Sequence, residues 1–138
     1  MSYMLNNDCK HIFVIEDDII IKKTNVFKKY IDVAKEFNLG HLNFCRAWDS
    51  ITKKYLFPFV TINGKNEKLQ LFRRLCGDFQ YFTQDALLKV GLIDDVNYIN
   101  ALEHAEHTYR MSLHRFYTPF NAFADIADST EYIEDDGV

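Results

Sequence analysis

Hydrophobic positions recur along the first third of the chain in a pattern that predicts alternating strands and helices. Residues 11–15 (HIFVI) form a short apolar run rich in β-branched residues, which is typical of a strand buried inside a sheet. Thr24 can then cap a helix whose apolar positions recur with helical spacing as far as Phe37, and Gly40 would end it. The alternation over residues 41–47 predicts a second strand.

The middle of the chain predicts a β-hairpin. Two β-rich stretches, residues 54–61 and 69–75, flank the pair Asn63-Gly64, which favours a tight turn. Pro58 makes the first stretch an edge strand or interrupts it, because proline cannot donate a ladder hydrogen bond.

The rest of the chain predicts one more strand and two helices. Residues 78–83 continue the strand pattern, and a helix over about residues 83–90 would end at Gly91. Residues 100–116 carry a second long helical pattern. The tail, residues 123–138, mixes small and acidic residues and predicts no clear closing element.

These elements indicate an α/β protein with a mixed β-sheet flanked by helices, in a single domain over residues 1–138. A chain of 138 residues, 48% of them hydrophobic, is long enough for one core. The net charge of −4, with both signs mixed along the chain, argues against a nucleic acid partner. No apolar run reaches the roughly 18 residues of a membrane-spanning helix, and no secretory signal is recognisable, so we expect no transmembrane segment. The three scattered cysteines, Cys9, Cys45 and Cys76, favour a cytoplasmic location.

Aromatic residues are abundant, and we expect most of them in the core. The single tryptophan, Trp48, would either pack over a strand end or stack on a sugar ring. The basic pair Arg73-Arg74 is interpreted as a solvated edge. Core positions are predicted for the phenylalanines of the strand candidates: Phe57, Phe59, Phe72, Phe79 and Phe82.

The first candidate for chemistry is the triplet Glu16-Asp17-Asp18, directly after the buried strand. On an extended strand Glu16 and Asp18 point to the same side, about 7 Å apart. Two such carboxylates suit a hard divalent cation, Mg²⁺ or Mn²⁺, whereas the alternative is an acidic turn that is merely solvated. Because residues 19–21 are again apolar, we favour the metal hypothesis, with Glu16 and Asp18 as ligands.

The second candidate is the helical segment 103–110 (EHAEHTYR). Glu103, Glu106, His107 and Arg110 share one helix face, and His104 lies beside it. One alternative is a charged surface with a Glu106–Arg110 ion pair. Another is a zinc site made by Glu103, His104 and His107, although no distant further ligand is obvious.

Together the two motifs resemble those of GT-A glycosyltransferases, most closely the family 2-like bacterial enzymes. The strand-end triplet is similar to the DxD motif of that family, with its first carboxylate at Glu16 and its last at Asp18. Segment 103–110 is similar to the family's Glu-Asp-x-Asp-x-x-x-Arg motif, and residues 77–79 resemble the acceptor-side stretch that precedes it. The resemblance implies a partial GT-A-like, nucleotide-diphospho-sugar transferase architecture. It also implies that Mn²⁺ or Mg²⁺, bound by Glu16 and Asp18, holds the donor diphosphate.

The resemblance further implies an activity, as in polysaccharide biosynthesis. A sugar would pass from a nucleotide sugar to a hydroxyl of a glycan or another acceptor. His104 stands where the family has its usual aspartate base, so either Glu103 or His104 would deprotonate the acceptor hydroxyl. Asp17, Glu106 and Arg110 would orient the helix and the ligand.

One departure from the family is large. In that family a long series of strands and helices that binds the nucleotide precedes the DxD strand, whereas this sequence reaches the motif at residue 16. We therefore expect the metal and acceptor side of a glycosyltransferase: a piece, a shortened homologue, or a chain completed by a homo-oligomer. The alternatives are a non-catalytic assembly or acceptor-binding module and a metal-dependent hydrolase that uses the same carboxylates.

Overall fold

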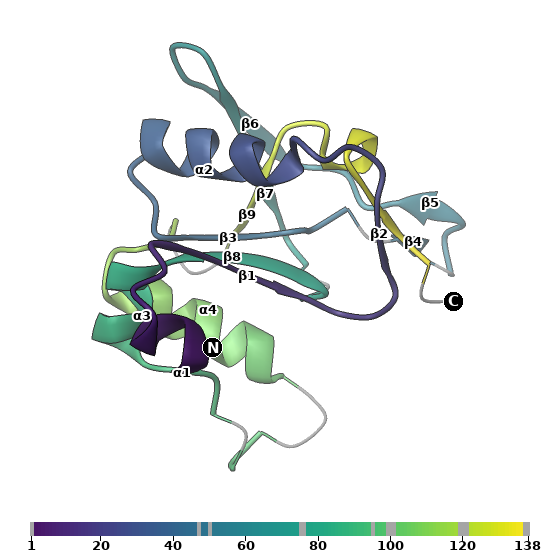
Figure 1. The fold of residues 1–138 in the computed structure, drawn as a ribbon. Helices are drawn as coiled ribbons and strands as arrows, with labels where there is room; N and C mark the ends of the chain where they lie inside the picture. Colours follow the sequence, from purple (N-terminus) through teal and green to yellow (C-terminus); the bar gives the residue numbers. More distant parts are fainter. Residues whose placement is uncertain are drawn as a thin grey trace.

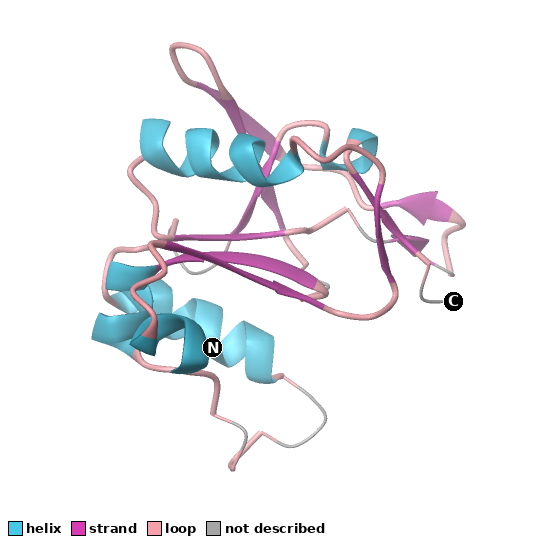
Figure 2. Cartoon of the chain, viewed as in Figure 1, coloured by secondary structure: helices cyan, strands magenta, loops and turns pink. Residues whose placement is uncertain are grey.

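The predicted class is confirmed by the computed structural model, a mixed α/β arrangement of helices around small antiparallel sheets (Figures 1 and 2). Within the part of the chain that the structure describes, there are four α-helices, one 3-10 helix and ten strands in four sheets. The described residues are 2–46, 48–49, 51–74, 77–94, 96–98, 102–118 and 122–136.

The central sheet has the order β1-β8-β3, and both outer strands run antiparallel to β8. Its strands are β1 (His11–Ile15), β8 (Phe79–Thr83) and β3 (His41–Asn43). Strand β8 is buried over almost its whole length because helices cover both faces of the sheet. In Figure 1, α2 (Val26–Glu36) lies on one side of the sheet. The other side carries α1 (Ser2–Asn6), α3 (Gln84–Val90) and α4 (Glu103–Leu113).

The predicted hairpin is confirmed, with a longer turn than expected. Strands β6 (Val60–Asn63) and β7 (Lys68–Phe72) pair antiparallel, and β9 (Phe123–Ile126) completes this second sheet. The connection is the four-residue loop 64–67 instead of a two-residue Asn-Gly turn. Glu36 of α2 explains the difference, since its carboxylate accepts hydrogen bonds from backbone N–H groups of that loop.

The prediction of an irregular tail is wrong. Besides β9, the tail forms a 3-10 helix (Ser129–Glu131) and β10 (Ile133–Asp135), which pairs antiparallel with β2 (Ile19–Ile21). Strand β10 has only three residues, two of them acidic, so its own sequence carries little strand signal. The last small sheet joins β4 (Trp48–Asp49) and β5 (Lys54–Tyr55).

The boundaries of α2 and α4 differ from the predicted ones. The residue before α2 is Asn25 and not Thr24, and its side chain makes no capping hydrogen bond. Helix α4 spans Glu103–Leu113, so it ends three residues before the predicted residue 116. Residues 99–101 and Pro119 lie outside the described part of the chain. The side chain of Trp48 is likewise outside the description.

The core prediction holds for three of the five phenylalanines. Phe72, Phe79 and Phe82 are buried, whereas Phe57 and Phe59 are exposed. The two exposed residues lie on the connection between β5 and β6, on either side of Pro58, which cannot donate a ladder hydrogen bond. Among the described helices none is long and apolar enough to cross a membrane.

Candidate active site

Three aspartates from different parts of the chain form an acidic group at one end of the central sheet. One carboxylate oxygen from each of Asp18, Asp78 and Asp135 lies within 4.8 Å of the other two. Asp18 lies in the turn between β1 and β2, Asp78 just before β8, and Asp135 at the end of β10. All three side chains are partly buried.

The pairing of β1 with β8 brings Asp78 to the end of β1, where the acidic triplet begins. Ile15 lies opposite Phe79 in the antiparallel register. One step further along, the backbone N–H of Glu16 donates to the carbonyl of Asp78 at 2.9 Å. The ladder therefore fixes Asp78 beside the Glu16-Asp17-Asp18 triplet.

The pairing of β2 with β10 brings in the third carboxylate. Asp135 lies opposite Ile19, and the backbone N–H of Asp136 donates to the carbonyl of Asp18 at 2.8 Å. Figure 1 shows β2 and β10 side by side beyond the central sheet. Backbone hydrogen bonds thus fix both Asp78 and Asp135 beside Asp18.

The acidic group fits a hard divalent cation. Two carboxylates about 4 Å apart repel by about 4 kcal/mol at an effective dielectric constant of 20, so three of them oppose one another strongly. Oδ1 of Asp18 is buried and has no hydrogen-bond partner among the described residues. Buried polar atoms are normally paired, and carboxylate oxygens are the ligands preferred by Mg²⁺, Mn²⁺ and Ca²⁺. A cation would offset the repulsion and satisfy this oxygen.

His104, in the first turn of α4, joins the helix to the acidic strand end. Its Nε2 lies 3.2 Å from Oε1 of Glu16 and 3.6 Å from Oε1 of Glu103. Its Nδ1 lies 3.0 Å from Oε1 of Gln80 on β8. The structure thus brings together the two motifs, which are far apart in the sequence.

Gly77 makes room for the His104 ring. It has φ +84°, and a Cβ added to it would lie 2.6 Å from Cδ2 of His104. Any side chain here would strain the backbone and displace the imidazole. The chain also enters α4 through Leu102 at φ 67°, a left-handed conformation that costs a non-glycine residue about 1 kcal/mol or more.

Glu103 and His104 differ in how far their side-chain atoms are engaged by neighbours. Both ring nitrogens of His104 face oxygen atoms, of Gln80 and of Glu16. Oε2 of Glu103 is without a partner in the described part of the chain. Because a base needs a lone pair that is not engaged, this arrangement favours Glu103 over His104.

The remaining charged residues of α4 lie away from the acidic group and fasten the helix. Arg110 pairs with Glu106 and donates to carbonyls of residues 90 and 92 at 3.0 and 2.8 Å. Nε2 of His107 lies 2.7 Å from the carbonyl of residue 91, and burial lowers the pKa of His107 to about 4. No group of three metal-ligating side chains among the described residues contains His104 or His107, so the zinc alternative finds no support.

Of the two predicted metal ligands, only Asp18 lies in the acidic group. Glu16 faces His104 instead, and Asp17 is exposed and makes no side-chain hydrogen bond or ion pair with a described residue. Sequence reasoning missed Asp78 and Asp135 as metal ligands. The signal for Asp78 was its place after Gly77 at the start of a buried strand, but nothing marked Asp135 within an acidic tail.

No protein-family model matches this chain, and no curated protein was found to be similar to it.

Proposed function

We propose that this chain carries the metal and acceptor side of a glycosyltransferase. The reaction would move a sugar from a nucleotide sugar to a hydroxyl of a glycan or another acceptor. The observation that carries the proposal is the meeting of the two motifs, with His104 3.2 Å from Glu16. Beside that contact stands an aspartate group whose donor atoms suit Mn²⁺ or Mg²⁺.

Asp18, Asp78 and Asp135 are the residues that would hold the metal. Bound there, the ion would supply positive charge to offset the charge that develops on the departing diphosphate. Glu16 would not be a ligand in this arrangement. Its carboxylate instead positions the His104 ring, because the contact between them fixes the orientation of the imidazole.

Glu103 would act as the base. As the acceptor oxygen attacks the anomeric carbon, its proton passes to Glu103, and the diphosphate leaves with the electron pair of the broken bond. Attack in line with the leaving group inverts the configuration at that carbon. His104 would hold Glu103 and Glu16 in place, and the hydrogen bonds of Arg110 would keep α4 in register with the site.

Nucleotide-sugar hydrolysis and transfer, measured with Mn²⁺ and with EDTA, test the proposal. Glu103→Gln should lower the turnover about 100-fold or more while leaving nucleotide-diphosphate binding unchanged, since a base acts in the chemical step. Asp18→Asn should weaken metal-dependent binding of the nucleotide diphosphate about 10-fold or more. Unaltered binding in Asp18→Asn would contradict the metal assignment, and full turnover in Glu103→Gln would contradict the base.

A non-catalytic assembly module is the second candidate, because large apolar side chains are exposed on α3 and α4. They include Leu88, Tyr109 and Leu113. Neighbouring exposed apolar residues are a feature of interaction surfaces. Sedimentation analysis, together with a titration of metal and nucleotide diphosphate, separates the two candidates. A dimer that binds neither ligand would favour the module.

A further inference from the structure

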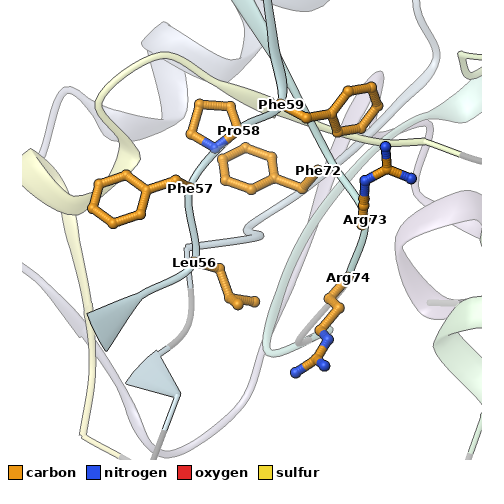
Figure 3. Close-up of a pocket in the computed structure, with 7 residues that line it drawn as sticks. All are labelled: Leu56, Phe57, Pro58, Phe59, Phe72, Arg73 and Arg74. Atoms are coloured by element: carbon orange, nitrogen blue, oxygen red, sulfur yellow. The ribbon is translucent and has the colours of Figure 1, made fainter. Parts of the chain in front are cut away.

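A pocket of about 290 Å³ lies between the connection that follows β5 and the end of β7. No member of the acidic group lines it, so it is distinct from the candidate active site. Figure 3 shows apolar side chains on one side and two guanidinium groups on the other. The lining residues are Leu56, Phe57, Pro58, Phe59, Phe72, Arg73 and Arg74.

The apolar side of the pocket includes two aromatic rings that the core does not use. Phe57 is 68% exposed and Phe59 is 44% exposed, whereas Phe72 is buried and belongs to β7. Single exposed apolar residues are ordinary. Here two aromatic rings and Pro58 are adjacent in the chain and line the same hollow, which gives a ring-shaped ligand several apolar surfaces to contact.

Each exposed ring carries a guanidinium group on its face. Arg73 lies over Phe59, with its Cζ 4.8 Å from the ring centroid, and Arg46 lies over Phe57 at 5.8 Å. Neither arginine forms an ion pair with a described carboxylate, and Nε of Arg46 is buried without a hydrogen-bond partner there. The stacking fixes the guanidinium groups but leaves their hydrogen-bond donors for a ligand.

Arg74 adds a third positive charge. Its nearest acidic partner is Asp49, at 3.8 Å between Nη1 and Oδ2, which is at the limit of an ion pair. Among the described residues, these three arginines have one ion-pair partner, Asp49. Guanidinium groups bind carboxylate and phosphate in pairs of parallel hydrogen bonds, so the excess charge calls for an anionic ligand.

We propose that this pocket binds a sugar ring that carries a carboxylate or a phosphate group. The ring would pack against Phe57 and Phe59, and the anionic group would accept hydrogen bonds from Arg73 and Arg74. The anionic ring follows from the pocket itself, whereas the choice of a sugar over other ring anions rests on the proposed function.

The chain connection relates the pocket to the acidic group. Arg74 precedes Asp78 by four residues, so their Cα atoms are at most about 14 Å apart. An oligosaccharide can bridge that distance. An acceptor glycan would therefore place an acidic unit in the pocket while a neighbouring unit presents its hydroxyl to Glu103.

Titration of the ¹⁵N-labelled protein, followed by NMR, tests the proposal with glucuronate and glucose 6-phosphate as probes. Both should bind about 10-fold or more tighter than glucose or inorganic phosphate, and shift resonances of residues 56–59 and 72–74. Arg73→Gln should weaken binding about 10-fold, and Phe57→Leu several-fold. The matched controls Arg115→Gln and Tyr109→Leu, at exposed positions away from the pocket, should leave the affinity unchanged.

Three results would overturn the proposal. If inorganic phosphate bound as tightly as the acidic sugars, the pocket would recognise only negative charge. If glucose bound as tightly as they do, the anionic group would contribute nothing to binding. Binding of phenyl phosphate without either acidic sugar would assign the pocket to an aromatic anion. Asp18→Asn should retain the binding of both sugar probes, with or without Mn²⁺. An absence of transferase activity would therefore count against the proposed function, whereas the binding of the acidic sugars would still support the pocket proposal.

Discussion

Asp125 lies in β9, and Asp18 lies in the turn between β1 and β2. Of these two aspartates, only Asp125 has a hydrogen-bond partner for each carboxylate oxygen among the described residues. Asp125 is fully buried and accepts hydrogen bonds from the Tyr30 hydroxyl at 2.6 Å and the backbone N–H of Cys45 at 3.0 Å. Asp18 faces two further carboxylates, and its Oδ1 is unpaired among the described residues. The first arrangement joins α2, β9 and the segment that follows β3, and it stabilises the fold. The second leaves Oδ1 of Asp18 unsatisfied at some cost in stability, as expected of a ligand site.

The largest expected effect comes from removing the satisfied carboxylate. Asp125→Ala would remove the buried carboxylate that accepts from the Tyr30 hydroxyl and the Cys45 N–H, so we expect it to lower the free energy of unfolding by about 3–5 kcal/mol. Asp18→Asn removes one of three repelling charges and should change the free energy of unfolding by less than about 1 kcal/mol, or raise it. Urea unfolding in EDTA measures both. Equal destabilisation by the two substitutions would remove the distinction between the two clusters.

Acid should lower the free energy of unfolding through the interior of the protein, because two buried histidines are held neutral in the folded state. Burial lowers the pKa of His41 to about 3 and that of His107 to about 4, from 6.5. The unfolded chain then binds protons first as the pH falls below 6.5, so stability decreases from there toward pH 4. For His107 the shift from 6.5 to about 4 corresponds to roughly 3 kcal/mol.

Thermal unfolding between pH 7 and pH 4 checks this slope. His107→Gln keeps a hydrogen-bond donor toward residue 91 and should flatten the pH dependence, whereas exposed His114→Gln should leave it as it was. Burial raises the pKa of Asp125 to about 6, so protonation of that residue stabilises the fold as the pH falls from 6 toward 4 and offsets part of the loss. An unchanged slope in His107→Gln would contradict this assignment.

A smaller loss of stability is expected at Gly77, where a substitution tests whether this glycine supports the contact between His104 and Glu16. Gly77→Ala adds a Cβ that would lie 2.6 Å from the His104 ring, and should cost about 1–3 kcal/mol and break the His104–Glu16 contact. Gly91→Ala is the matched control. It also has a positive φ, of +91°, but the nearest atom is 3.7 Å away. The NMR shifts of the His104 ring should move in Gly77→Ala and not in Gly91→Ala; the opposite result would show that Gly77 does not support the ring.

The sequence was sufficient to predict β1, α2 and β8, because continuous apolar runs and helical spacing mark buried elements directly. Asp18 was found for the same reason, since it follows such a strand. Asp135 was not, because β10 is specified by its pairing with β2 and not by its own composition. Long-range pairing of short strands leaves no local periodicity to read.

Helical periodicity likewise identified one face of α4 without its surroundings. His104 and His107 are three residues apart, yet His104 meets Glu16 and His107 is buried against residue 91. Which neighbours cover each residue depends on how the loop after α3 folds back, and that is a property of the tertiary structure. The exposure of Phe57 has a similar origin, because Pro58, the next residue, cannot donate a ladder hydrogen bond.

Calorimetric titration of the metal-free protein with Mn²⁺ tests the central claim most directly. We predict binding of a single ion, weakened about 10-fold or more by Asp18→Asn and by Asp135→Asn, and unchanged in Asp17→Asn, which alters an exposed carboxylate of the same triplet. Equal affinities in all four proteins, or a loss in Asp17→Asn as large as that in Asp18→Asn, would contradict the acidic group as a metal site.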